Sequence, residues 1–130
     1  MIWPLIVMIA FNILNAFIDA YRILKNKKIA HGINFGAYIL VFMLVVWVFQ
    51  IRPIKIGELV FCWLFGRQIF FDPVLNLRRG LKIDYVSLDK PPKAWLDRQE
   101  VRLWGYNGRI ALAVYGIGFI ISTLIYVIMK

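Results

Sequence analysis

The amino-acid sequence predicts an all-α integral membrane protein with four transmembrane helices, and three observations lead to this fold class. First, 62% of the 130 residues are hydrophobic and the mean hydropathy is +0.72, whereas a soluble domain has roughly 45–50% apolar residues. Second, the apolar residues gather in four segments, each close to the ~20 residues that cross about 30 Å of hydrocarbon. Third, the 16 Lys and Arg residues lie mainly between these segments. A water-soluble globular protein is therefore excluded, and the length predicts a single membrane domain over residues 1–130.

The first two expected transmembrane helices cover residues 2–21 and 33–50. Apart from Asn12, Asn15 and Asp19 the first segment is apolar, and no Lys or Arg precedes it. Because a cleavable signal peptide carries a basic segment before its apolar stretch, we expect this helix to be retained. The second segment is nearly unbroken and has VFMLVVWVF at its centre, which is typical of a membrane-spanning helix.

The last two expected transmembrane helices cover residues 54–71 and 110–129. The third segment is the most polar of the four, since it carries Glu58 and Arg67, whereas the fourth contains no charged residue. Only three residues separate the third segment from the second. Because Pro53 keeps the residue before it out of the helical region, we expect the chain to turn there and the two helices to form a tight antiparallel hairpin.

A partly helical loop is expected over residues 72–109, the only long stretch outside the bilayer. Asp72 followed by Pro73 is typical of a helix start, and Gly80 is typical of a helix end. We therefore expect a short helix over residues 73–79 that lies at the inner membrane surface. A second helix is expected over residues 93–104, after a pair of prolines that breaks the chain.

Basic residues in this loop predict an interaction with anionic lipids. Arg78, Arg79 and Lys82 would lie at the level of the lipid phosphates and bind headgroups; the alternative is an ordinary solvated basic loop. Acidic and basic residues nearly balance over the loop as a whole, at five and seven between residues 72 and 108. This balance favours folding against the membrane or a partner protein, and nucleic acid is not an expected partner.

The distribution of Lys and Arg predicts the orientation, because positively charged loops are retained in the cytoplasm. Thirteen basic residues fall on the side of the connectors 22–32 and 72–109. Only Arg52, Lys55 and Lys130 fall on the opposite side. We therefore expect both connectors to be cytoplasmic and both termini to face away from the cytoplasm, in a membrane such as the bacterial inner membrane.

The polar residues of the first segment share one face of the helix. Asn12, Asn15, Asp19 and Arg22 fall within an arc of about 80° at 100° per residue, and Asp19 can pair with Arg22 one turn on. One interpretation is that these side chains bond across helices and hold the bundle together. Another is a polar half-path for ions, protons or a small solute, completed from the other leaflet by Glu58. A third is a docking face for another membrane protein.

Small residues share a face of the fourth segment. Ala111, Gly118 and Ser122 lie within about 40° of one another, and Gly118 with Ser122 has the small-xxx-small spacing that lets helices approach closely. This face predicts helix packing, either between copies of the protein or inside one four-helix bundle.

The sequence predicts no catalytic, metal-binding or cofactor-binding site. One histidine and one cysteine cannot assemble a histidine or cysteine metal centre. The leading hypothesis is a small membrane protein that acts by helix association, as a homo-oligomer or as an accessory subunit of a membrane complex. A pore or channel, such as a phage-type lytic pore, is the alternative. A lipid-modifying enzyme that uses Asp84 and Asp89 is the third.

Overall fold

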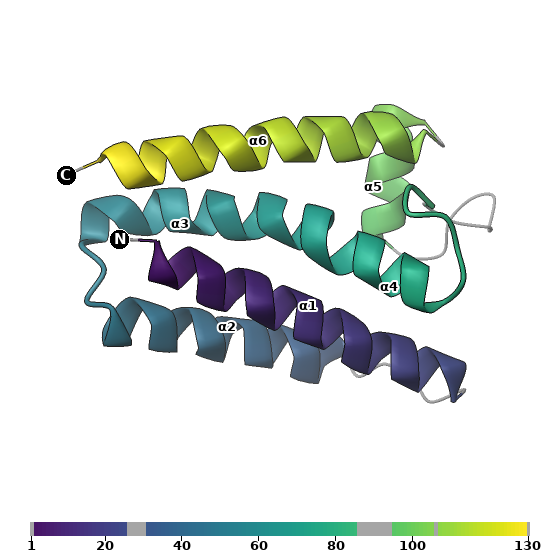
Figure 1. Cartoon of the computed structure of the whole chain (residues 1–130), viewed down its shortest axis with the longest axis horizontal. Helices are drawn as coiled ribbons and strands as arrows, with labels where there is room; N and C mark the ends of the chain where they lie inside the picture. Colours follow the sequence, from purple (N-terminus) through teal and green to yellow (C-terminus); the bar gives the residue numbers. More distant parts are fainter. Residues whose placement is uncertain (1, 26–30, 86–94, 106, 130) are drawn as a thin grey trace.

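The computed structural model of the chain is entirely helical over the residues that it describes (Figure 1). The described residues are 2–25, 31–85, 95–105 and 107–129. In chain order the helices are α1 (Trp3–Leu24), α2 (His31–Val48), α3 (Pro53–Gly66), the π-helix η1 (Arg67–Phe71), α4 (Asp72–Arg78), α5 (Trp95–Trp104) and α6 (Gly108–Ile128). The prediction of an all-helical protein is confirmed.

Two of these helices are long and apolar enough to cross a membrane. They are α1, with 22 residues, and α6, with 21 residues; at 1.5 Å per residue each covers about 32 Å. A shorter apolar helical stretch lies in α2 over Ile33–Val48. Figure 1 shows that both ends of the chain lie at one end of the bundle, whereas α4 and α5 lie at the other.

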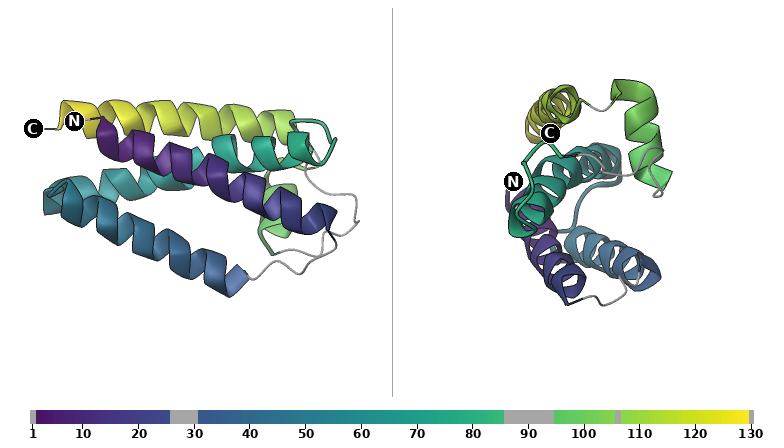
Figure 2. Two further views of the ribbon diagram at one scale, coloured as in Figure 1. Left: turned by 60° about the horizontal axis from the view of Figure 1, so that its bottom comes forward. Right: turned by 90° about the vertical axis from the view of Figure 1, so that its right-hand side faces the viewer.

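The predicted turn before Pro53 is present. Arg52 has an extended backbone, with φ −61° and ψ 141°, and α3 begins at the proline. Beyond this turn α2 and α3 separate, and α1 packs against both of them (Figure 2). Side chains rather than backbones bridge the gap: the ring of Trp63 on α3 lies 5.5 Å from that of Tyr38 and 5.8 Å from that of Phe42 on α2.

The short helix predicted over residues 73–79 is present as α4, but it is continuous with the third helical segment, which does not end at Phe71. Helix α3 runs through η1 into α4, and Asp72 has helical dihedral angles instead of capping a new helix. Pro73 lacks an N–H group and its ring would clash with the carbonyl four residues back in an α-helix. The wider π turn immediately before the proline moves that carbonyl away, so the helix continues along α1.

The predicted helix end at Gly80 is present. Gly80 has a φ of +72°, which favours glycine. Its N–H donates to the carbonyl of Leu77 at 3.1 Å, and the N–H of Leu81 donates to the carbonyl of Asn76 at 2.9 Å. These two bonds form a Schellman motif. Helix α5, which follows later, lies across the end of α6 (Figure 2).

The interior of the bundle is divided into an apolar half and a polar half. The apolar cluster lies toward the end that holds the two termini. Its buried residues are Leu5, Met8, Val45, Ile51, Leu59, Cys62 and Tyr126. Further along α1 the buried positions become polar. The outer surface is rich in large apolar side chains, including Leu40, Trp47, Ile54, Leu64 and Leu124, which are all at least 49% exposed.

Candidate functional site

The polar side chains of α1 face the interior of the bundle. Asn12, Asn15 and Asp19 are only 1%, 7% and 4% exposed. Ala16 and Ala20 on the same face are also buried, at 0% and 2% exposure, and their small side chains let the neighbouring helices approach. A buried charge is stable only where other groups pair with it, so the environment of Asp19 decides how this site is built.

The carboxylate of Asp19 is held by a residue from α2 and a residue from its own helix. Asn34 donates from Nδ2 to Asp19 Oδ1 at 3.0 Å and to Oδ2 at 2.9 Å. Arg22, one turn after Asp19, has its Nη1 atom 3.8 Å from Oδ1 and donates to Asn34 Oδ1 at 3.4 Å. The expected pair of Asp19 and Arg22 is therefore present, but its contact is longer than both bonds from Asn34.

A second ion pair joins η1 to the start of α4. Arg67 Nη1 lies 4.0 Å from Asp72 Oδ2, and its guanidinium lies over the ring of Phe71 at 4.6 Å. Both η1 and α4 pack against α1. The polar site thus draws residues from α1, α2 and the α3–α4 segment, and its two acids are balanced by Arg22 and Arg67.

Glu58 does not join this site in the structure. It lies on α3, one turn before the buried Cys62. Within the described part of the chain, no hydrogen bond or ion pair connects Glu58 to Asn12, Asn15 or Asp19. A path completed by Glu58 from the other leaflet therefore stays a prediction.

The small residues of α6 lie against α3 of the same chain. A Cβ atom on Gly118 would lie 2.8 Å from the ring of Phe65, and one on Gly66 would lie 3.1 Å from the ring of Phe119. Ala111 and Ser122 are buried as well, at 5% and 6% exposure. Of the two interpretations of this face, the structure supports packing inside one bundle.

The basic residues of α4 lie at the polar end of the bundle. The guanidinium of Arg78 lies over the ring of Phe17 on α1 at 4.1 Å. Arg78 and Lys82 are exposed and Arg79 is half-buried. Because α4 continues α3, these residues stand at the end of a long helical segment and not on a separate surface helix.

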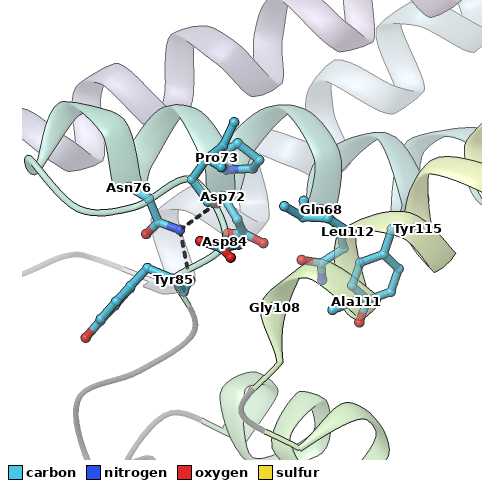
Figure 3. Close-up of a pocket in the computed structure, with 11 residues that line it drawn as sticks. Gln68, Asp72, Pro73, Asn76, Asp84, Tyr85, Gly108, Ala111, Leu112 and Tyr115 are labelled. Atoms are coloured by element: carbon cyan, nitrogen blue, oxygen red, sulfur yellow. Dashed lines mark hydrogen bonds between the residues drawn. The ribbon is translucent and has the colours of Figure 1, made fainter.

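A small open pocket of about 30 Å³ lies between α4, the loop after it and the start of α6 (Figure 3). Asp72 and Asp84 both line it. Asp84 accepts a hydrogen bond from Arg109 Nε at 3.0 Å. The buried Asn76 donates to the carbonyl of Tyr85 at 2.9 Å and so holds the loop against α4. Asp89, the other acid of the enzyme hypothesis, lies outside the described residues.

Sequence analysis missed the partners of the polar stripe. Asn34 and Tyr38 are four residues apart and so share one face of α2, and a buried acid on the preceding helix needs donors of this kind. A second missed signal is the GxxxG spacing of Gly32 and Gly36 on the same helix. Both patterns are visible in the sequence.

Comparisons with protein-family models, with curated proteins and with solved structures find no match to this chain. The function is therefore argued from the geometry of the described residues.

Proposed function

We propose that the protein crosses the membrane four times, through α1, α2, the α3–α4 segment and α6. The support is the position of the turns in Figure 1: the two chain ends and the turn before Pro53 lie at one end of the bundle, and α4 and α5 lie at the other. The excess of basic residues at the end that holds α4 and α5 supports a cytoplasmic location for that end. There Arg78, Arg79 and Lys82 would meet the phosphates of anionic lipids.

We further propose that the protein acts without catalysis, by association of its transmembrane helices with those of a second copy or of a larger membrane complex. The single observation that carries this proposal is the outer face of α2. Gly36 is exposed, and no atom lies within 4 Å of the position that a Cβ would occupy. Beside it stand Leu40, Met43 and Trp47, which are 59%, 63% and 76% exposed.

The glycine spacing on this face favours association between identical copies. Gly36 lies about 160° around α2 from the buried Tyr38, so it points away from the bundle. Gly32 precedes it by one turn of the helix. Glycines four residues apart remove side chains from a strip of helix surface and let two such strips meet at short distance, where van der Waals packing drives association in lipid.

The alternative of a path for ions or small solutes has less support from the geometry. Such a path needs water to reach Asp19, but this carboxylate is 4% exposed and both of its oxygen atoms accept hydrogen bonds from Asn34. The small residues that could have joined copies through α6 are used against α3. On α2, by contrast, Gly36 remains open to a partner beside large exposed apolar side chains.

We expect Gly36→Leu to weaken self-association at least tenfold, which corresponds to about 1.4 kcal/mol, because the added side chain keeps the two backbones apart. The measurement is fluorescence energy transfer between donor- and acceptor-labelled protein in lipid vesicles, with the lipid-to-protein ratio varied. Gly116→Leu on α6 is the matched control, since Gly116 also has open space around it. Equal association of both variants and the parent would refute a role for this face.

A further inference from the structure

Among the residues that the structure describes, two polar atoms of the bundle interior have no hydrogen-bond partner. They are the side-chain carbonyl oxygen of Asn12 and the hydroxyl group of Tyr38. Asn12 is 1% exposed and Tyr38 is 6% exposed, so neither atom reaches the solvent. Turning the amide of Asn12 around exchanges its oxygen for its nitrogen and leaves a donor unpaired in place of an acceptor.

The two atoms belong to the same part of the bundle. The ring of Tyr38 packs edge-on against that of Phe11, the neighbour of Asn12, with centroids 4.9 Å apart. Asn15, one turn further along α1, is close enough to the Tyr38 hydroxyl to interact with it, but no hydrogen bond of good geometry satisfies that hydroxyl. The two unsatisfied groups therefore lie on neighbouring turns of the contact between α1 and α2, together with the amide of Asn15.

A buried polar group without a partner is costly, and the cost is greater in a membrane, where no bulk solvent is near. Buried water molecules meet such groups in proteins and typically make about three hydrogen bonds each. We propose that the bundle contains an internal water-binding site formed by Asn12, Asn15 and Tyr38. The water donates a hydrogen bond to Asn12 Oδ1 and accepts one from the Tyr38 hydroxyl.

The chemistry of the site selects water over an ion. Its groups are two amides and a phenol, all uncharged, so they do not neutralise a bound cation. An anion would need more donors than one hydroxyl and two amides supply. Water, which both donates and accepts, matches an unpaired acceptor beside an unpaired hydroxyl.

A water at this position extends the polar network toward the middle of the bundle. The network of Asp19, Arg22 and Asn34 lies nearer the polar end, and Asn15 and Asn12 follow along the same face of α1. The water joins Asn15 and Asn12 to α2 through Tyr38. The polar side of α1 is then bonded to α2 at two levels, first through Asn34 and then through the water.

Thermal unfolding in lipid nanodiscs tests the site with Tyr38→Phe, Asn12→Leu and the double variant. If water bridges the two groups, each single substitution leaves the water short of a partner. We then expect each to lower the unfolding midpoint by about 4 °C, and the double variant to lose less than the sum. Tyr21→Phe, at a tyrosine that is 58% exposed, should leave the midpoint unchanged.

An unfolding midpoint that stays the same or rises contradicts the proposal. Replacing a polar atom that is truly unpaired by an apolar group is neutral or stabilising, so an unchanged or higher midpoint in both single variants means that no water is bound. Solid-state NMR supplies a second measurement in the parent protein, by transfer of magnetisation from water protons to the Tyr38 ring carbons. If magnetisation transfer from water to Tyr38 is as weak as transfer to the buried Leu59, the proposed water-binding site is also contradicted.

Discussion

Asn34→Leu is expected to lower the free energy of unfolding by about 3 kcal/mol, because it leaves a buried carboxylate without its two closest donors. Both short contacts to Asp19, at 2.9 and 3.0 Å, come from the Asn34 amide. Arg22 is 3.8 Å from the carboxylate and its side chain is 33% exposed, so it replaces only part of the lost interaction. The measurement is reversible unfolding in detergent micelles, followed by circular dichroism.

The double variant Asp19→Leu/Asn34→Leu separates loss of the pair from loss of packing. Replacing both members of a buried polar pair by apolar residues is nearly neutral, so we expect its free energy of unfolding to lie within about 1 kcal/mol of the parent. If Asn34→Leu alone leaves the stability unchanged, the carboxylate does not depend on Asn34 and the site described above is incorrect.

Gly118→Leu is expected to lower the free energy of unfolding by about 3 kcal/mol through overpacking. Even the first added carbon would lie 2.8 to 2.9 Å from three atoms of the Phe65 ring. The ring cannot withdraw freely, because it is stacked against Phe61 on the same helix with centroids 6.4 Å apart. The same unfolding measurement gives the effect.

Gly116→Leu is the control for this prediction, since a side chain at Gly116 meets open space and Leu is favoured over Gly in a helix by up to about 1 kcal/mol. Its stability should equal or exceed that of the parent. Combining Gly118→Leu with Phe65→Ala should recover part of the loss. Equal stabilities for the two glycine variants would mean that α6 does not pack on α3 through Gly118.

Much of the fold can be predicted from the sequence, because hydropathy and proline position fix where helices lie. The expected segments 2–21 and 110–129 match α1 and α6 to within three residues at each end. The inward direction of Asn12, Asn15 and Asp19 follows from the physical rule that polar groups in a membrane protein turn to other polar groups. Both results depend on local composition and helical periodicity alone.

The rest of the fold and of the site depends on contacts between helices that are distant in the sequence. A proline after an acid predicts a new helix start, but the π turn before Pro73 lets the helix continue, and only its packing along α1 explains why. The choice of Asn34 as the partner of Asp19 requires the relative rotation of α1 and α2. Gly118 could serve either an internal or an external contact, and only the position of Phe65 decides between them.

We propose that four helices cross the membrane and that the polar end of the bundle lies in the cytoplasm. Single cysteines at Ile2, Lys25, Arg52 and Arg102 test it in bacterial cells with a thiol reagent that does not cross membranes; the parent is the control, since its Cys62 is 1% exposed. The account predicts labelling at 2 and 52 in intact cells, and at 25 and 102 only after the membrane is permeabilised. Labelling of 52 together with 25, or of 102 from outside, would contradict it.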